Sequence, residues 1–268
     1  MWDSWPFTDA TGLHHLFYLQ ADRSLLHPAL RHMHPSIGHA TSRDYREWTI
    51  LPDALAPSPG PAWDDATTWT GSVIQGDDGR YHLFYPGPSR ADNCKIQRIG
   101  RADSEDLIHW ERFGTEALVE ADPRYYEKYD GSGAWNDEAF RDPWVIRDPE
   151  GNGWHMFITA RSNTGDKFSR GVVGHAWSAN LDRWEVRAPL SQPGPFGQLE
   201  VPQPVELPEG PHMVFSCATT EYGQALLKAG TPSGVWIMPG DGPLGPWHPE
   251  KARRIAHDSL YAARMIMD

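Results

Sequence analysis

GRYHLFYPG, residues 79–87, is an apolar segment that follows a glycine, and related segments occur at three other places in this chain of 268 residues. They are GLHHLFYLQ (12–20), GNGWHMFITAR (151–161) and EGPHMVFSCA (209–218). An apolar run of this length next to a glycine turn is typical of a β-strand. The recurrence of the first three copies, roughly every 70 residues, predicts a fold built from repeated units.

A second unit follows each of the first three segments. It begins with a strand of small residues and continues with Ser, an acidic or Asn turn, a Trp and another strand. The copies are IGHATSRDYREWTIL (37–51), IGRADSEDLIHWERF (99–113) and VGHAWSANLDRWEVR (173–187), and SGVWIMPGDGPLGPWHPEKARRI (233–255) keeps the outline with a different turn. Each repeat therefore contains about four short strands joined by turns.

Four strands per repeat, arranged around an axis, form a β-propeller blade. We therefore expect an all-β, five-bladed β-propeller, with four complete blades and the start of a fifth at DSLYAARMIMD (258–268), in one domain over residues 1–268. No 3.6-residue period suggests helical repeats. The repeated unit also argues against an immunoglobulin-like sandwich.

The composition restricts the partners of this protein. A formal net charge of −12 argues against nucleic acid and anionic membranes, since both demand basic patches, but a small neutral carbohydrate is compatible with it. No apolar run approaches the length of a membrane span. The first residues lack the regions of a signal peptide, so we expect a cytoplasmic location unless an export signal has been removed. The 13 histidines form no metal-binding spacing, and we expect neither a metal nor a cofactor.

The segment before each repeated strand is expected to face the central channel of the propeller. These inner segments are WDSWPFTD (2–9), WTGSVI (69–74), AFRDPWVI (139–146), LEVPQPVEL (199–207) and LYAARMI (260–266). Three of them carry an acid at what we take to be equivalent positions, namely Asp3, Asp142 and Glu200. The residues expected around these acids are Trp2, Trp5, Trp69, Trp144 and Arg141.

Converging carboxyl groups with aromatic walls suit the cleavage of a glycosidic bond. Each acid also has a structural alternative: Asp142 as an ion-pair partner of Arg141, Asp3 as a turn residue, and Glu200 as a solvated rim residue. Other acids are expected to be surface or turn residues, and these are Asp9, Asp130, Asp137 and Glu138.

The same segments resemble glycoside hydrolase families 32 and 68. WDSWP (2–6) resembles the nucleophile motif of levansucrases in family 68. The segments at 34–57 and WTGS (69–72) are similar to the invertase and inulinase group, family 32. FRDP (140–143) resembles the Arg-Asp-Pro motif shared by both families, and LEVPQPVEL (199–207) resembles their acid/base motif. The family fold that this implies is a five-bladed propeller.

The resemblance implies a role for each residue. Asp3 corresponds to the nucleophile, Glu200 to the general acid/base and Asp142 to the transition-state stabiliser. Arg141 would orient this cluster. The fructose subsite would be lined by Trp2, Trp69 and Thr70.

The chain also departs from the family 32 pattern. It has Trp-Asp-Ser-Trp where most members carry Asn-Asp-Pro, and Thr70 where they carry Ser. We expect no C-terminal β-sandwich of the family 32 kind. These departures favour a levansucrase-like or short, unassigned branch.

Three functions remain open. A retaining β-fructofuranosidase or levansucrase-like fructosyltransferase, acting on sucrose or fructans, predicts Asp3 and Glu200 carboxyls roughly 5–5.5 Å apart. An inverting propeller glycosidase, such as an arabinofuranosidase, predicts roughly 6.5–9.5 Å. A non-catalytic carbohydrate-binding propeller predicts sugar binding without turnover. A second copy of the chain could also complete the fifth blade, because an open propeller leaves an exposed strand edge.

Overall fold

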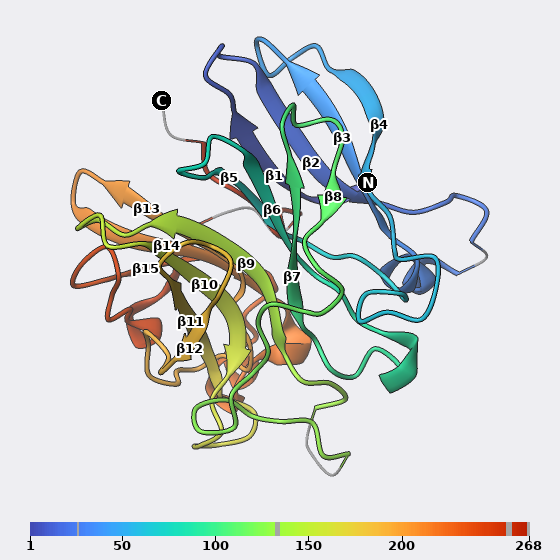
Figure 1. The fold of residues 1–268 in the computed structure, drawn as a ribbon. Helices are drawn as coiled ribbons and strands as arrows, with labels where there is room; N and C mark the ends of the chain where they lie inside the picture. The colour runs from blue at the N-terminus through green and yellow to red at the C-terminus, as the bar shows by residue number, and fades with distance from the viewer. Residues whose placement is uncertain (26, 132–134, 256–258, 267–268) are drawn as a thin grey trace.

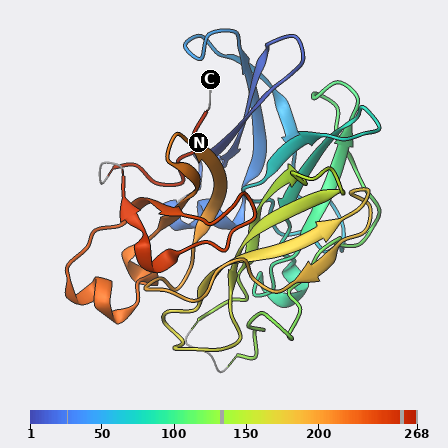
Figure 2. The same ribbon diagram turned by 90° about the vertical axis from the view of Figure 1, so that its left-hand side faces the viewer.

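The computed structural model is a β-propeller of four sheets, each with four antiparallel strands in the order of the chain. It describes residues 1–25, 27–131, 135–255 and 259–266. Figure 1 shows the sheets following one another from blue to orange, and Figure 2 shows the same sheets from the side. The prediction of an all-β propeller with four blades in this chain is confirmed.

The bounds of the strands follow the repeats of the sequence. Blade one contains β1 (Trp2–Thr8), β2 (His14–Gln20), β3 (Ser36–Ser42) and β4 (Thr49–Leu55). Blade two contains β5 (Ser72–Gln75), β6 (Tyr81–Pro86), β7 (Ile99–Ser104) and β8 (Glu111–Arg112). Blade three contains β9 (Phe140–Arg147), β10 (Trp154–Arg161), β11 (Gly171–Ser178) and β12 (Glu185–Arg187). Blade four contains β13 (Glu200–Leu207), β14 (Gly210–Cys217), β15 (Gly234–Pro239) and β16 (Arg253–Arg254).

Helical structure is limited to short segments in the connections. The 3₁₀ turns are Pro28–Met33, Arg90–Asp92, Thr219–Glu221 and Pro249–Lys251. The α-helix α1 spans Gln224–Lys228. Within the described ranges, no helix has the length and apolar character needed to cross a membrane.

The repeated Ser-acid-Trp unit forms the turn between the third and fourth strands of a blade. In blade two, Asp106 accepts hydrogen bonds from the backbone N–H groups of Ile108 and His109, at 2.9 and 2.8 Å. Leu107 adopts a φ of +65°, and the indole of Trp110 donates to its carbonyl at 3.0 Å. The sequence therefore repeats this pattern because a side-chain acceptor and a tryptophan together fix a tight turn.

The second strands of blades two and three are apolar on both sides because each of these blades packs between two neighbours. In β6, Leu83 and Tyr85 join a buried cluster with Trp5 of blade one. Phe84 points to the other face and joins a cluster with Phe140 of blade three. Successive side chains of a strand point to opposite faces, so a sheet buried on both faces needs an uninterrupted apolar run.

Each inner strand except β5 contains a bulge with a left-handed residue. Asp3, Asp142 and Val201 have φ values of +40°, +53° and +48°, and at each of them the inner strand has one more residue than the second strand that pairs with it. A bulge of this kind redirects side chains and is common next to active sites. Glu200 occupies the position in β13 that Arg141 occupies in β9, which is one residue before the bulge. The expectation that Glu200 is equivalent to Asp3 and Asp142 was therefore wrong by one residue.

The expected start of a fifth blade lies along blade four as an extended segment. Over residues 259–266 it forms no assigned strand, and the remainder of 258–268 lies outside the described residues. Ala262 donates its N–H to Ser216 Oγ at 2.9 Å, and Met265 exchanges two 2.8 Å hydrogen bonds with the Gln203 amide. Ala262 also has a positive φ, of +52°. The segment thus shares a left-handed residue with the other inner segments.

Two buried histidine pairs connect the second and third strands of blades one and three. His15 Nδ1 lies 2.9 Å from His39 Nε2, and His155 Nδ1 lies 2.8 Å from His175 Nε2. Burial lowers the pKa of His39 to about 4 and that of His175 to about 3. Both histidines are therefore neutral in the folded protein at pH 7.

These pKa values predict an acid-sensitive fold. Unfolded histidine titrates near pH 6.5, so the stability associated with neutral His39 and His175 is present above that pH and is lost as the pH falls toward 4. When the pH is lowered from 7 to 4.5, we expect the free energy of unfolding to decrease in the wild type. In His175→Gln this decrease should be smaller by roughly 2 kcal/mol, because glutamine does not take up a proton on unfolding. Urea unfolding at a series of pH values measures this difference. His109→Gln, at a highly exposed histidine, is the control. Identical pH dependence in H175Q and the wild type would contradict the prediction.

Candidate active site

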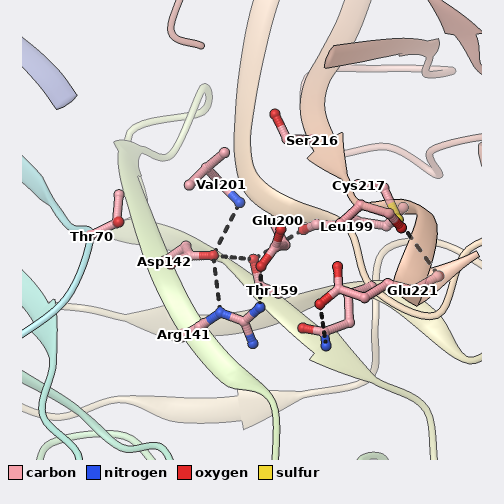
Figure 3. A network of polar contacts seen from close by, with 12 residues as sticks. Thr70, Arg141, Asp142, Thr159, Leu199, Glu200, Val201, Ser216, Cys217 and Glu221 are labelled. Atoms are coloured by element: carbon pink, nitrogen blue, oxygen red, sulfur yellow. Dashed lines mark hydrogen bonds and ion pairs between the residues drawn. The ribbon is translucent and has the colours of Figure 1, made fainter. Parts of the chain in front are cut away.

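The inner strands surround a cavity of about 670 Å³. The seven residues to which the family resemblance gives a role all line it, namely Trp2, Asp3, Trp69, Thr70, Arg141, Asp142 and Glu200. They come from all four blades, so the cavity exists only where the blades meet. Figure 3 shows the centre of this network, with Arg141 next to the carboxyl groups of Asp142 and Glu200.

Asp142 is buried at the bulge of β9, with 4% of its surface exposed. Its Oδ2 accepts hydrogen bonds from Thr159 Oγ1 at 2.8 Å and from the N–H of Val201 at 3.1 Å. The same oxygen lies 3.5 Å from Arg141 Nε. Burial raises the pKa of Asp142 and Glu200 adds to this effect, whereas Arg141 lowers it. The carboxyl group is therefore held by polar contacts from two blades.

Arg141 is the cation shared by two carboxyl groups. Its Nη2 lies 2.5 Å from Glu200 Oε1, and its Nη1 donates to Gln97 Oε1 at 3.3 Å. Burial opposes the charge on this guanidinium, but Glu200 and Asp142 hold its pKa above the ordinary value. Arg141 and the adjacent Asp142 therefore form an ion pair, and Arg141 forms a second ion pair with Glu200 of the next blade.

Glu200 is the first residue of β13 and is partly exposed to the cavity, with 19% of its side chain accessible. Besides the contact with Arg141, its Oε2 accepts a hydrogen bond from the hydroxyl of Tyr261. Leu199 is fully buried and Val201 nearly so. The immediate partners of this carboxyl are hydrogen-bond donors.

Asp3 occupies the bulge of β1. Its Oδ2 accepts a 2.8 Å hydrogen bond from Thr70 Oγ1 of the neighbouring blade. Burial raises the pKa of Asp3 to about 6, and the charges of Asp142 and Glu200 add to the rise, whereas Thr70 and Arg264 oppose it. Asp3 is therefore a carboxylate at neutral pH but one that protonates readily below pH 6.

Two tryptophans form the wall of the cavity beside Asp3. Trp2 meets His32 edge to face, with ring centroids 5.6 Å apart, and the indole of Trp69 donates to the carbonyl of His32 at 2.9 Å. The other two expected wall residues do not line the cavity: Trp5 is fully buried in the core, and Trp144 packs against the core clusters. Trp5 lies two residues after the bulge at Asp3, and Trp144 lies two residues after the bulge at Asp142. At these positions the side chains point into the interfaces between blades.

Several cavity residues were not singled out in the sequence. Asp137 lies in a bend with a third of its side chain exposed and lines the cavity. Glu138 is buried against Lys128 at 2.5 Å, so the expectation of a surface or turn residue was wrong for Glu138. Glu221 also lines the cavity, and its Oε1 accepts from Gln198 at 3.0 Å. Burial and the charge of Glu200 raise the pKa of Glu221 to about 8, although Arg141 opposes this. No repeat or motif marks these positions.

The segment after blade four contributes two further groups. Tyr261 lines the cavity and donates to Glu200, as described above. Arg264 lies behind the cavity wall and donates to the carbonyls of Val201 and Pro202 at 2.8 and 3.1 Å. A signal for both was present in LYAARMI (260–266), because the segment repeats the inner-strand position. Among the described residues, no group of three or more His, Cys, Asp or Glu side chains forms a metal site.

The sequence model of the glycosyl hydrolases family 32 N-terminal domain matches residues 3–268 of this chain. The chain belongs to glycosyl hydrolase family 32. The suspected relationship to the propeller enzymes of families 32 and 68 is thereby confirmed.

Named relatives agree with this assignment to family 32. The chain is 30% identical over 177 residues to a sucrose-6-phosphate hydrolase of Zymomonas mobilis, covering 65% of this chain and 30% of that protein. It is 30% identical over 156 residues to beta-fructofuranosidase 1 of Zea mays, covering 56% and 21%. The structure of an inulosucrase from Halalkalicoccus jeotgali bound to kestose superimposes with a TM-score of 0.74 at 25% identity, covering 92% of this chain and 66% of that one. This chain thus spans less than a third of the length of these two curated relatives.

The shared cation predicts a stability effect at the site. Arg141→Met leaves the Asp142 and Glu200 carboxyls close together without their partner, and breaking a buried ion pair costs about 3–5 kcal/mol. We expect urea unfolding to show a loss of that size, with part of it recovered in the double variant R141M/D142N. Arg124→Met, which removes an exposed ion pair with Asp122, should change the stability far less, because water screens an exposed pair. Equal losses in R141M and R124M would contradict the prediction.

Proposed function

We propose that this chain is a retaining glycosidase or fructosyltransferase that acts on β-fructofuranosides such as sucrose or fructans. The observation that carries the proposal is the convergence of Asp3, Asp142 and Glu200 on one cavity of a family 32 propeller. Its partner is a small neutral carbohydrate. The names of the relatives, a β-fructofuranosidase and a sucrose-6-phosphate hydrolase, support this substrate class.

Asp3 is the proposed nucleophile. Its Oδ1 or Oδ2 attacks the anomeric carbon of the fructosyl unit, the bond to the leaving sugar breaks, and a covalent ester forms. The pKa of about 6 leaves Asp3 ionised at neutral pH, as a nucleophile requires. Thr70 fixes the carboxylate by its hydrogen bond from the neighbouring blade.

Glu200 is the proposed general acid and base. In the first step its carboxyl donates a proton to the glycosidic oxygen, so that the leaving sugar departs as an alcohol. In the second step it accepts a proton from water or from a sugar hydroxyl, which attacks the ester and releases the fructosyl unit from Asp3. Arg141 and Tyr261 contact the two oxygens of Glu200 and orient it for both steps.

Asp142 is the proposed transition-state stabiliser. Its hydrogen bonds from Thr159 and Val201 both end on Oδ2, which leaves Oδ1 to accept from sugar hydroxyls. Hydrogen bonds that strengthen as positive charge develops on the sugar ring lower the barrier. The carboxylate is thus positioned to bind rather than to transfer a proton.

Two alternatives are less well supported. An inverting arabinofuranosidase would use Asp3 as a base for water, and it would release a sugar of inverted configuration. A carbohydrate-binding propeller would bind sugar without turnover. The family 32 match favours neither. Nuclear magnetic resonance of the first product, before mutarotation, separates retention from inversion.

Substitution of the two proposed catalytic carboxyls should have different consequences. We expect Asp3→Asn to lower the turnover of sucrose by at least about 10³-fold, because the ester cannot form. Glu200→Gln should slow sucrose cleavage strongly but slow a fructoside with an acidic leaving group much less, because that group needs no proton. Steady-state kinetics on both substrates, with circular dichroism to verify folding, measures this. Equal losses of E200Q activity on the two substrates would rule out the acid role.

A sucrose incubation with glucose and fructose quantified separately distinguishes hydrolysis from transfer. Equal amounts indicate hydrolysis, and glucose in excess of fructose indicates fructosyl transfer. A folded protein that releases neither sugar would contradict the proposal for sucrose and direct the search to fructans.

A further inference from the structure

A second, smaller hollow adjoins the candidate active site on the side of blade three. Asp137 lines both the cavity and this hollow. The Oδ2 of Asp137 accepts a hydrogen bond from Gln97 at 3.0 Å, and its Oδ1 accepts one from Arg161 at 2.9 Å. The carboxylate is therefore a fixed wall that the two spaces share. We call the second space the Trp135 hollow, and its other lining residues include Tyr129, Trp135, Lys167 and Arg170.

Trp135 is an aromatic side chain of this hollow that several contacts hold in place. Its indole N–H donates to the carbonyl of Lys167 at 2.7 Å, and the guanidinium of Arg161 lies 4.9 Å from the ring centroid. The ring also packs against Gly197, where an added Cβ would lie 2.5 Å from Cζ2 of the indole. Trp135 nevertheless remains partly exposed. An aromatic surface that is already fixed loses little conformational freedom when a ligand packs on it.

Gly197 also connects the Trp135 hollow to one end of the cavity. Its N–H donates to the carbonyl of Glu221 at 2.6 Å, and Glu221 lines the cavity. Figure 3 shows Glu221 and Thr70 on opposite sides of the Glu200 carboxyl, and Thr70 is the residue that holds Asp3. The hollow therefore lies beyond Glu200 when viewed from the proposed nucleophile.

This end of the cavity is where the leaving sugar is expected. In the proposed reaction Asp3 attacks the fructosyl unit, and Glu200 protonates the oxygen that joins this unit to the leaving sugar. The leaving sugar therefore extends from the scissile bond away from Asp3. In a disaccharide it is the last unit, whereas in a longer chain another unit follows it toward Asp137 and Trp135.

The charged groups of the Trp135 hollow are already paired. Arg170 Nη1 lies 2.8 Å from Glu127 Oε2, and Lys128 Nζ lies 2.5 Å from Glu138 Oε1. Paired charges disfavour an anionic ligand such as a phosphate, but the remaining donors and acceptors can still bind hydroxyl groups. An aromatic surface next to such polar groups suits the apolar face and the hydroxyl edge of a neutral sugar ring.

We propose that the Trp135 hollow binds the sugar unit that follows the leaving sugar, so that this chain prefers fructosyl oligosaccharides of three or more units to sucrose. The inference rests on the proposed function and deepens it by naming the length of the substrate. Trp135 supplies the surface on which the additional ring packs. Asp137 forms the wall between this ring and the leaving sugar.

The test measures kcat/KM for kestose, a trisaccharide, and for sucrose in the wild type, Trp135→Ala, Trp135→Leu and Trp135→Phe. In W135A we expect the ratio of kcat/KM for kestose to that for sucrose to fall about tenfold, because alanine removes the aromatic surface. The loss should appear mainly in the KM for kestose, since a contact far from the scissile bond is made equally in the ground state and the transition state. W135F retains a ring and should keep most of the ratio. Leucine keeps an apolar contact with Gly197, so W135L gives the same comparison if W135A does not fold.

Trp177→Ala is the matched control. The indole of Trp177 also donates to a backbone carbonyl, that of Asn152 at 3.1 Å, and the guanidinium of Arg187 lies 4.7 Å from its ring centroid. Trp177 lines neither the cavity nor the Trp135 hollow, so W177A should leave the ratio unchanged. Equal losses on both substrates in W135A would assign Trp135 a purely structural role and overturn the proposal. An unchanged ratio in a folded W135A or W135L would also overturn it.

A binding measurement separates this inference from the proposed function. Isothermal titration calorimetry of D3N, and of D3N combined with W135A, reports the Kd of kestose without turnover. A Kd about tenfold higher in the double variant supports the inference even if the wild type cleaves neither sugar. Equal Kd values, or no binding of kestose to D3N, overturn the inference even if the wild type is an active fructosidase.

Discussion

Burial of like charges is the constraint on which the centre of this propeller depends. Asp3, Asp142 and Glu200 meet in one cavity, where Asp142 and Glu200 raise the pKa of Asp3 and Glu200 also raises that of Asp142. Such a cluster is tolerated only when cations and hydrogen-bond donors offset the desolvation and repulsion. Arg141 contacts two of the carboxyls directly, and the charge of Arg264 opposes the rise in the pKa of Asp3. The reactive state of Asp3 is therefore a property of the whole cluster.

The bulges of the inner strands make this cluster geometrically feasible. A regular strand would alternate its side chains between the two blade interfaces, and no carboxyl would reach the channel from a well-packed blade. A left-handed residue at Asp3, Asp142 and Val201 breaks the alternation locally. Aspartate tolerates this conformation better than a β-branched residue. At Val201 the strain is balanced by the N–H that the bulge exposes, which donates to Asp142 of the preceding blade.

The repeats made most of the fold and part of the site predictable from the sequence. A period with four strands and a fixed turn indicates a propeller, and the inner segments then contain the seven predicted site residues, all of which line the cavity. The register within those segments was not predictable, because a bulge shifts the side chains after it, which is why Trp5 and Trp144 pack in the interfaces. Asp137, Glu138 and Glu221 reach the site or its surroundings from loops, whose course depends on tertiary contacts. The sequence shows an arginine at position 264, but it does not show that the guanidinium group is buried.

The distribution of the site over the blades has a physical consequence for the chemistry. The relative position of the proposed nucleophile and the proposed acid is set by the packing between blades, such as Phe84 against Phe140, and not by any single turn. Protein interiors are close-packed and resist small displacements, so this arrangement holds the carboxyls rigidly. The hydrogen bonds that cross between blades, from Thr70 to Asp3 and from Val201 to Asp142, transmit that rigidity to the reactive atoms. A substitution in the core of a blade interface therefore alters the distance between the carboxyls and acts on catalysis as well as on stability.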